Sequence, residues 1–179
     1  MNDVKFSRYW AMPSSDTFDV VPIAEFVKKY LRESKVSIDP FARNTSWATH
    51  TNDLNPDTRA DHHMEALDFL AMLKEKQVLA DLVIFDPPYS NRQIVECYGG
   101  VGRKVKQSDT QAPWNAWRNA IAPLVKDGGI VLSFGWNTNG IGLKHNFSIM
   151  EIMLIAHGMN HNDTICMAEI KGETPPSLF

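Results

Sequence analysis

The stretch LADLVIFDPPYS, residues 79–90, decides the fold and locates the first candidate site. Residues 79–85 are apolar except for Asp81, and the run LVIF at 82–85 is typical of a strand covered on both faces of a sheet. The run stops at Asp86, and two prolines that have no backbone N–H to donate come next, before Tyr89. Either this loop simply breaks a strand, or it holds a ligand against an acid and an aromatic ring.

Outward from this strand, the chain alternates between strand and helix patterns. Helices are expected over residues 22–34, 63–77 and 112–129, with a short helix or turn over 91–100. Strands are expected over residues 35–42, near 48–52, and over 79–85, 129–137, 147–158 and 163–172. The alternation predicts one α/β domain over residues 1–179, with its core at about 13–170. Its sheet is mixed and mostly parallel, with a C-terminal antiparallel hairpin and helices on both faces.

Apolar spacing and capping residues refine three of these helices. The first helix is expected to bury Ile23, Phe26, Val27 and Leu31, and to be capped by Asp16, Thr17 or Asp19. The second is expected to bury Leu67, Leu70, Met72 and Leu73. Gly128 and Gly129 are expected to stop the third.

The composition is that of an ordinary globular protein and excludes several classes. The 179 residues are 44% apolar and 22% charged, with no membrane-length apolar run and no signal-peptide pattern, so a cytoplasmic protein is expected. Cys97, Cys166 and the six histidines lack metal-ligand spacing, so no metal site is predicted. The net charge of −3 counts mildly against tight nucleic-acid binding. Arg103, Lys104 and Lys106 form either a solvated loop or a phosphate-contacting patch.

Three acids follow expected strands: Asp39, Asp53 and Asp86. Ligands of such sheets collect at the carboxyl ends of parallel strands. The sequence therefore predicts a site where these acids meet, without identifying its chemistry.

Motifs in a fixed order identify a family resemblance that covers roughly residues 13–170. DPPY, at Asp86, Pro87, Pro88 and Tyr89, resembles the catalytic motif of amino-methyltransferases that use S-adenosylmethionine to methylate exocyclic amines of nucleic-acid bases. The aspartate is typical of the N6-adenine branch. The chain also resembles the compact adenine-specific methyltransferases of bacteriophage genomes, which implies a Rossmann-like methyltransferase domain in a bacterial host cell.

The same resemblance implies a set of cofactor-binding residues. They are Asp39, Pro40, Phe41 and Ala42 in SIDPFARN, Asp53 and Leu54 in TNDLNP, Glu65 and Ala66 in MEALDFL, and Ser14, Asp16, Thr17 and Phe18 in MPSSDTFDV. Asp53 could instead form an ordinary Asx-turn, and Glu65 or the fallback Asp68 could belong to a solvated helix face. The family's glycine-rich turn is replaced by Ala42-Arg43-Asn44. Either the cofactor sits differently, or Arg43 contacts its carboxylate, or its binding is weaker.

The chemistry that the resemblance implies is methyl transfer to an adenine amine in DNA that is flipped out or single-stranded. Asp86 and the Pro87 carbonyl would accept N–H groups, and Tyr89 would stack on the base. Candidate substrate residues are Ser90, Ser133, Trp136 and Asn137. Trp114 and Trp117 could line the base pocket but fit the core better.

The substrate and the activity leave alternatives open. The same chemistry could act on cytosine N4, RNA or a modified nucleotide, or the protein could be a catalytically silent binding module. No segment is long enough for a separate target-recognition domain, so selectivity would come from short loops such as residues 91–112, from a homodimer or from a partner.

Overall fold

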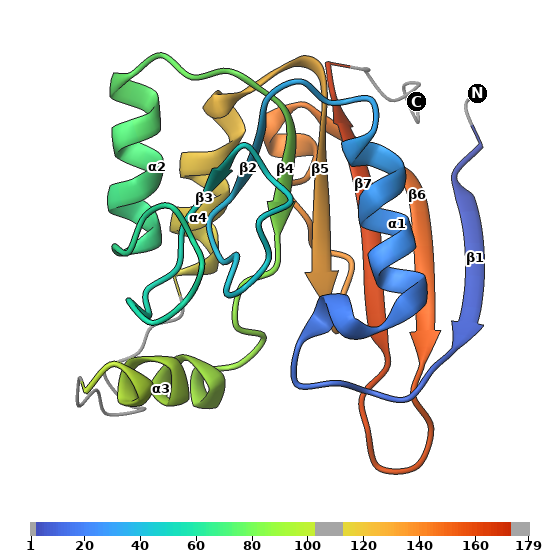
Figure 1. Ribbon diagram of the computed structural model, residues 1–179. Helices are drawn as coiled ribbons and strands as arrows, with labels where there is room; N and C mark the ends of the chain where they lie inside the picture. Colours follow the sequence, from blue (N-terminus) through green and yellow to red (C-terminus); the bar gives the residue numbers. More distant parts are fainter. Residues whose placement is uncertain (1–2, 103–112, 173–179) are drawn as a thin grey trace.

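The computed structural model describes residues 3–102 and 113–172, and a seven-stranded sheet forms the centre of this part of the chain (Figure 1). The strands are β1 (Lys5–Trp10), β2 (Ser37–Asp39), β3 (His50–Thr51), β4 (Ala80–Phe85), β5 (Val125–Gly135), β6 (Phe147–Ala156) and β7 (Thr164–Lys171). Their order is β1-β6-β7-β5-β4-β2-β3. β7 runs antiparallel to β5 and β6, and the other pairs are parallel. The predicted mixed sheet with a C-terminal antiparallel hairpin is confirmed.

Helices pack on both faces of this sheet. They are α1 (Val21–Leu31), α2 (Ala66–Glu75), α3 (Asn91–Gly100) and α4 (Trp114–Ile121), with 3-10 turns η1 (Thr17–Asp19), η2 (Ala122–Leu124) and η3 (Leu143–His145). Successive strand residues point to opposite faces. On β4, Val83 and Phe85 therefore join the core under α2 and α4, while Leu82 and Ile84 join the core under α1. The continuous apolar run of residues 82–85 is explained by burial on both sides.

The start of α1 differs from the sequence prediction. The helix is preceded by Val20, which caps it without a side-chain hydrogen bond, and Pro22 lies in its first turn. Thr17 and Asp19 are part of η1, so the predicted capping role of Asp16, Thr17 or Asp19 is wrong. The chain makes a separate 3-10 turn before the helix. Inside the helix Ile23, Phe26 and Val27 are buried as expected, with Tyr30 in place of Leu31.

The buried face of α2 is rotated from the expected one. Ala66, Phe69, Leu70 and Leu73 are buried at the i, i+3, i+4, i+7 spacing of one helix face. Leu67 lies off that stripe and is 38% exposed, so its predicted inward position is wrong. Met72 is half-buried and packs at the edge of the core.

The predicted end of the third helix is also wrong. α4 ends at Ile121, and β5 begins at Val125 and includes Gly128 and Gly129. A Cβ on Gly129 would lie 2.7 Å from Cγ1 of Val125, so glycine is required inside the strand, where the chain is crowded.

β1 forms an edge strand that the sequence pattern did not predict. Nearly all of its residues are exposed, so it shows no alternation of buried and exposed positions. It is held by its parallel pairing with β6 and by the buried Glu151, whose carboxylate pairs with Lys5 and Lys29 and accepts a hydrogen bond from the Tyr30 hydroxyl at 2.5 Å. These partners lower the pKa of Glu151.

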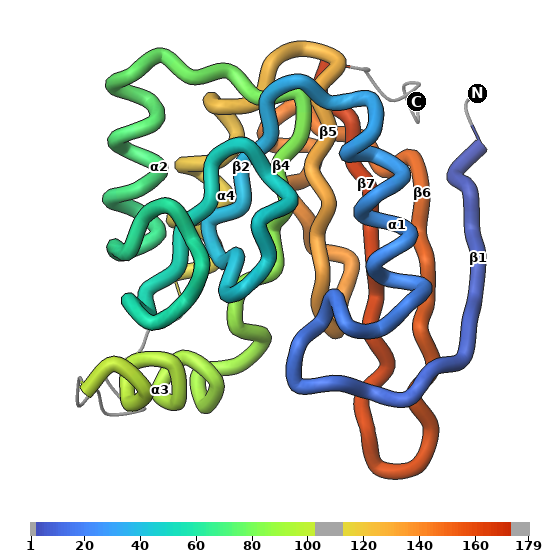
Figure 2. Tube along the Cα trace, in the orientation of Figure 1, coloured from blue at the N-terminus to red at the C-terminus, as the bar shows by residue number. Residues whose placement is uncertain are grey.

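The carboxyl ends of β2, β3, β4 and β5 meet at one edge of the sheet, since these four strands are parallel. Figure 2 shows the chain between β1 and α1 running along the same edge, and α3 lying beside it. Asp39, Asp53 and Asp86 are thereby brought together, as predicted. Within the described ranges, no helix combines the length and apolar character needed to cross a membrane.

Candidate active site

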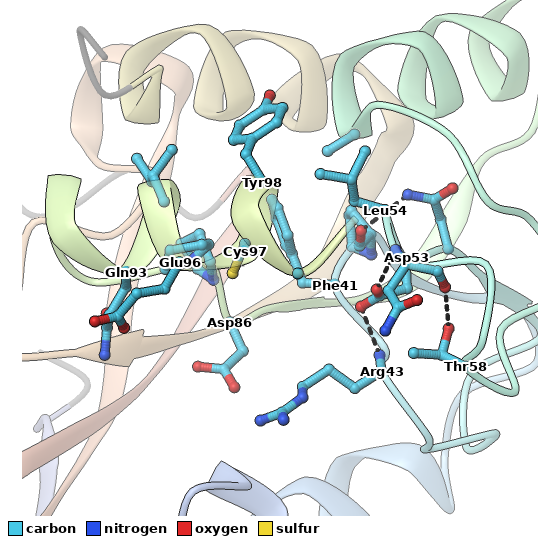
Figure 3. Close-up of a pocket in the computed structure, with 18 of the residues that line it drawn as sticks. Phe41, Arg43, Asp53, Leu54, Thr58, Asp86, Gln93, Glu96, Cys97 and Tyr98 are labelled. Carbon is cyan, nitrogen blue, oxygen red and sulfur yellow. Dashed lines mark hydrogen bonds between the residues drawn. The ribbon is translucent and has the colours of Figure 1, made fainter. Parts of the chain in front are cut away.

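A cavity of about 520 Å³ opens at this edge of the sheet (Figure 3). Its walls come from the loop before α1, the ends of β2, β3 and β4, the start of α2, and α3. Eleven of the predicted site residues line it: Thr17, Pro40, Phe41, Asp53, Leu54, Glu65, Ala66, Asp86, Pro87, Pro88 and Tyr89.

Asp86 follows β4 directly and is the acid at the centre of this edge. Its Oδ1 accepts a hydrogen bond from the Tyr89 hydroxyl at 2.6 Å. Loss of solvation raises the pKa of Asp86 to about 6, while hydrogen bonds from Tyr89 and Thr17 and the charge of Arg43 oppose the rise. The carboxylate is therefore mostly ionised at neutral pH and can accept an N–H group.

The loop after Asp86 is fixed from both ends. The Pro88 carbonyl accepts a hydrogen bond from Nε1 of Trp114 at 3.0 Å. The Tyr89 backbone N–H donates to Oε1 of Gln93 at 2.5 Å, and the Gln93 backbone N–H donates to the Ser90 hydroxyl at 3.3 Å. Ser90 is therefore the N-cap of α3, and it lines neither cavity of this edge.

Asp39 organises the turn after β2 from a buried position. It is 1% exposed, and its Oδ1 accepts the Phe41 backbone N–H at 3.0 Å. Burial raises the pKa of Asp39 well above its usual range, and the nearby carboxylates of Asp86 and Asp53 raise it further. Pro40 and Phe41 line the cavity, whereas Asp39 and the buried Ala42 do not.

Asn52 is a structural residue of the site that the sequence analysis missed. Its side-chain amide donates to the carbonyls of Pro40 at 3.2 Å and Met64 at 3.1 Å, and its Oδ1 accepts the Met64 N–H. It thus joins the turn after β2 to the segment before α2. A buried amide that both donates and accepts can do this, whereas the neighbouring aspartate can only accept.

Asp53 forms the Asx-turn that the sequence left open, and it also lines the cavity. Its Oδ1 accepts the Asn55 backbone N–H at 2.8 Å, which is an Asx-turn. Its Oδ2 accepts the Arg43 backbone N–H at 3.0 Å. The same carboxylate lines the cavity, as Figure 3 shows.

Glu65, rather than Asp68, faces the cavity at the start of α2. Its Oε2 accepts a hydrogen bond from the Tyr98 hydroxyl at 2.8 Å. Asp68 is exposed in the first turn of the helix and does not line the cavity. Tyr98 comes from α3, together with Gln93 and Cys97, which also line the cavity. The sequence analysis expected a helix or turn there and placed target selectivity in short loops such as residues 91–112, but it named no cavity residue in α3.

Arg43 occupies the position where the methyltransferases that the sequence resembles have glycine, and its backbone is left-handed, with φ of 49°. The turn therefore keeps the conformation that favours glycine. The Arg43 guanidinium pairs with Asp16 and donates to the Ser15 carbonyl at 2.7 Å. In Figure 3 it extends toward the side of the cavity that holds Asp86. Arg43 thus bridges the turn after β2 and the loop before α1.

The loop before α1 contributes fewer cavity residues than expected. Thr17 lines the cavity, with its hydroxyl 3.5 Å from that of Tyr89. Asp16 pairs with Arg43, and the Ser14 hydroxyl hydrogen-bonds to Asp19 at 3.4 Å. The Phe18 ring packs against Trp47 and Phe134 in the core.

A second cavity, of about 430 Å³, lies against the same loop. Pro87 and Tyr89 line both cavities. The predicted Ser133, Trp136 and Asn137 line the second one, as do Trp114, Asn115, Arg118 and Asn139. Trp136 is 43% exposed, and its ring meets that of Tyr89 edge-to-face with 5.6 Å between centroids. Trp117, by contrast, is buried in the core as expected, although it also touches the first cavity.

The basic residues Arg103, Lys104 and Lys106 lie outside the described residues, as does the second half of the segment 91–112. In residues 3–102 and 113–172, no three His, Cys, Asp or Glu side chains are grouped so as to hold a metal ion.

Several solved structures are similar to this chain. SMU.776, described as a candidate methyltransferase complexed with SAH, has a TM-score of 0.53 at 10% identity, over 81% of this chain and 48% of its own. The candidate methyltransferase yhhF of Escherichia coli has a TM-score of 0.53 at 10% identity, over 92% of both chains. The hypothetical protein TTHA0928 of Thermus thermophilus has a TM-score of 0.51 at 13% identity, over 91% of this chain and 92% of its own.

These similarities show the fold. The chain has a Rossmann-like architecture shared with proteins described as methyltransferases, and it spans about half the length of SMU.776. No protein-family model and no curated protein matches the sequence.

Proposed function

We propose that this protein is an S-adenosylmethionine-dependent methyltransferase that methylates the exocyclic N6 amine of adenine in DNA. The observation that supports this function is the position of the catalytic loop between two cavities. Asp86 faces the first cavity, and its neighbours Pro87 and Tyr89 line both. A cofactor in the first cavity and a base in the second would therefore meet at this loop.

The residues of the first cavity fit a nucleoside that carries a zwitterionic amino-acid tail. Its volume is within the usual range of small-ligand sites. Asp53 can accept from ribose hydroxyls, and Glu65 can accept from the adenine amine of the cofactor. At the other end, Arg43 can pair with the carboxylate of the methionine moiety, since its guanidinium extends into the cavity. The cofactor has no phosphate, so the family's glycine-rich turn is not needed as an anion site.

Bound S-adenosylmethionine supplies an electrophilic methyl group on a positively charged sulfur. The cofactor, held by Asp53, Glu65 and Arg43, would give this methyl group to the amine nitrogen of the base, with the sulfur retaining the electron pair of the carbon–sulfur bond. The amine would gain positive charge and would release its proton to the Asp86 carboxylate or to water. Asp86 accepts an amine N–H and stabilises that charge, and the Pro87 carbonyl offers a second acceptor.

The target base must leave its stack to reach Asp86, because this residue lines a cavity at the sheet edge and is not exposed on an open surface. Tyr89 and Trp136 provide aromatic surfaces at the second cavity, and base stacking on such rings is worth about 1–3 kcal/mol. We place no separate target-recognition domain in this chain and expect its sequence selectivity to be short or relaxed. Protection of DNA at only one long recognition sequence would contradict that expectation.

Transfer of labelled methyl groups tests the function. Purified protein is incubated with labelled S-adenosylmethionine and unmethylated DNA, and the modified base is identified by mass spectrometry. N6-methyladenine is expected with the wild type and with the control Asp57→Asn, an exposed acid, and none with Asp86→Ala. Equal labelling by wild type and Asp86→Ala would remove Asp86 from the mechanism. Labelling of cytosine or RNA alone would change the substrate.

Cofactor binding gives a second, independent readout. S-adenosylmethionine is expected to raise the melting temperature of wild type and of Asp86→Ala alike, because a ligand that binds only the folded state stabilises it. A wild type that shows neither a thermal shift nor labelling would be a catalytically silent binding module.

A further inference from the structure

Two residues that line the second cavity each have a buried polar atom with no hydrogen-bond partner in the described part of the chain. These atoms are Nε of Arg118, on α4, and Oγ of Ser133, near the end of β5. Buried polar atoms in folded proteins are nearly always paired. Two such atoms on residues that line one cavity beside the proposed catalytic loop therefore point to a ligand that pairs with them.

Arg118 is held in place but not neutralised. Its Nη1 donates to Oδ1 of Asn115 at 3.2 Å, one helical turn away. Burial lowers the pKa of Arg118, and only the charge of Glu169 opposes that shift. A guanidinium remains charged in spite of this, so its remaining donors call for acceptors.

Glu169 does not hydrogen-bond to Nε of Arg118, and its carboxylate is engaged by the backbone instead. Its Oε2 accepts the Ile141 N–H at 2.6 Å, and its Oε1 accepts the Gly142 N–H at 2.9 Å. These bonds hold the loop that follows Trp136, which forms another wall of the same cavity through Asn137, Asn139 and Gly140. Glu169 thus shapes the cavity and leaves Nε of Arg118 available.

Ser133, on β5, has the second of these two buried polar atoms without a partner among the described residues. Its register partners are Phe85, which directly precedes Asp86, and Met167 on β7. The side chain is 8% exposed, so water solvates it poorly. Its hydroxyl can donate or accept, whereas Nε of Arg118 can only donate.

The chemistry around the target amine suggests which atoms of the base would accept hydrogen bonds from Arg118 and Ser133. In adenine the amine is flanked by two acceptors, N1 and N7. In cytosine it is flanked by the acceptor N3 on one side and by a C–H group on the other, which cannot accept. A site with two donors beside the amine acceptors therefore prefers adenine.

We propose that Arg118 and Ser133 read the ring nitrogens beside the target amine, and thereby select adenine over cytosine. This inference rests on the proposed methyltransferase function and assigns the substrate preference of the same site. With the amine held by Asp86, Arg118 donates to one ring nitrogen and Ser133 donates to the other. A substrate that lacks an acceptor at either position leaves a buried donor unpaired.

Substrates with single atoms replaced test this assignment. Single-stranded DNA oligonucleotides carry adenine, 7-deazaadenine or 1-deazaadenine as the only methylatable base. Each is used with wild type, Arg118→Met, Ser133→Ala and the control Arg32→Met, an exposed arginine at the end of α1. The measured quantity is kcat/KM, together with cofactor affinity as a check of folding.

With wild type and Arg32→Met, one deaza substrate is expected to react about 10- to 100-fold more slowly than adenine, as befits loss of a hydrogen bond to a charged donor. Arg118→Met is expected to react slowly with adenine but no more slowly with that deaza substrate. Ser133→Ala is expected to react equally fast with adenine and with the other deaza substrate. Its kcat/KM for adenine should be about 3- to 10-fold below that of the wild type.

Three results would overturn the inference while leaving the methyltransferase function intact. In the first, both deaza substrates react as fast as adenine in the wild type. In the second, Arg118→Met slows all three substrates by the same factor with normal cofactor affinity, and its KM loses much of its salt dependence; Arg118 then binds a phosphate. In the third, loss of cofactor affinity in Arg118→Met and Ser133→Ala assigns both residues to packing. If the wild type does not methylate the adenine oligonucleotide, the proposed function itself fails and this inference fails with it.

Discussion

The Tyr89 hydroxyl donates a hydrogen bond of 2.6 Å to Oδ1 of Asp86, within the loop that joins β4 to α3. Tyr89 is also the ring proposed to stack on the target base. The hydroxyl bonds only one oxygen of the carboxylate. An incoming amine can therefore use the other oxygen of Asp86, or it can displace the Tyr89 hydroxyl from Oδ1.

Replacement of Tyr89 by phenylalanine tests the electrostatic part of this relationship. The hydroxyl stabilises the ionised carboxylate and so lowers the pKa of Asp86 from the value that burial alone would give. In Tyr89→Phe that pKa is expected to rise above about 6, and the acid limb of the pH profile of kcat/KM should move to higher pH.

The profile is measured between about pH 5 and 8 under single-turnover conditions, beside Tyr9→Phe as an exposed control. An acid limb at the same pH in wild type and Tyr89→Phe would show that the hydroxyl does not influence the group that titrates.

The ionised carboxylate of Asp86 is also expected to lower the free energy of unfolding. Its pKa of about 6 in the folded protein lies above the ordinary value of 3.8. Between these values the folded state holds more protons than the unfolded state, so this group's contribution to the free energy of unfolding falls as pH rises from about 4 to 6. Asp86→Asn should therefore be more stable than wild type at pH 7, by up to about 3 kcal/mol, and equal to it below about pH 4.

Urea unfolding at both pH values measures this difference. The contrary finding would be an Asp86→Asn variant that is less stable than wild type at pH 7, which would mean that the carboxylate stabilises the loop.

Arg43 gives a prediction about cofactor recognition. Arg43→Gly should change the free energy of unfolding little. The substitution removes the strain of a non-glycine residue in the left-handed conformation, which stabilises the fold by about 1 kcal/mol. It also removes the exposed ion pair with Asp16, which costs about 0–1 kcal/mol. If Arg43 pairs with the methionine carboxylate, the variant should bind S-adenosylhomocysteine about tenfold more weakly.

Methylthioadenosine, which lacks the amino-acid tail, provides the control ligand. Calorimetry should give equal affinities for it in wild type and Arg43→Gly. A similar loss for both ligands would assign the effect to the shape of the turn instead of the charge.

Gly140 is predicted to be intolerant of any side chain. Its φ is 45°, and a Cβ there would overlap Oε2 of Glu169 and Cε of Met167. Gly140→Ala should lower the free energy of unfolding by about 3 kcal/mol, from backbone strain and overpacking together.

Gly158→Ala is the matched variant, since Gly158 also has a positive φ, of 71°, but a Cβ there comes no nearer than 3.5 Å to Nε1 of Trp10. It should cost only about 1 kcal/mol. Equal destabilisation of the two variants in urea titrations would show that crowding around Glu169 is relieved at little cost.

The parallel part of the sheet could be predicted from the sequence because its strands carry a strong signal. Residues 82–85 are apolar throughout, Asp39 ends its strand, and Asp53 and Asp86 follow theirs, so the convergence of the three acids follows from parallel pairing. β1 could not be predicted, since its residues are exposed and its pairing with β6 depends on backbone hydrogen bonds. Such bonds leave no mark in the pattern of side chains.

Cavity residues could be predicted where they belong to a sequence motif. They could not be predicted where tertiary packing alone brings them to the cavity. Thr17, Asp53 and Glu65 line the first cavity as the resemblance implied, but Tyr98 reaches it only because α3 lies across that edge. Arg118 looks like any arginine on an amphipathic helix. Its missing partner is visible only once the surroundings of α4 are known.

The position of β7 has a consequence for how the protein is made. It is the last strand in the described part of the chain, yet it lies between β5 and β6, and β1 reaches the rest of the sheet only through β6. A ribosome that has not yet released residues 164–171 therefore holds a nascent chain whose sheet is in two parts. Thr17, which follows β1, and Asp86, which follows β4, belong to different parts until that moment. Because domains are completed during or after synthesis, the proposed methylation activity should arise only after residues 164–171 have left the ribosome.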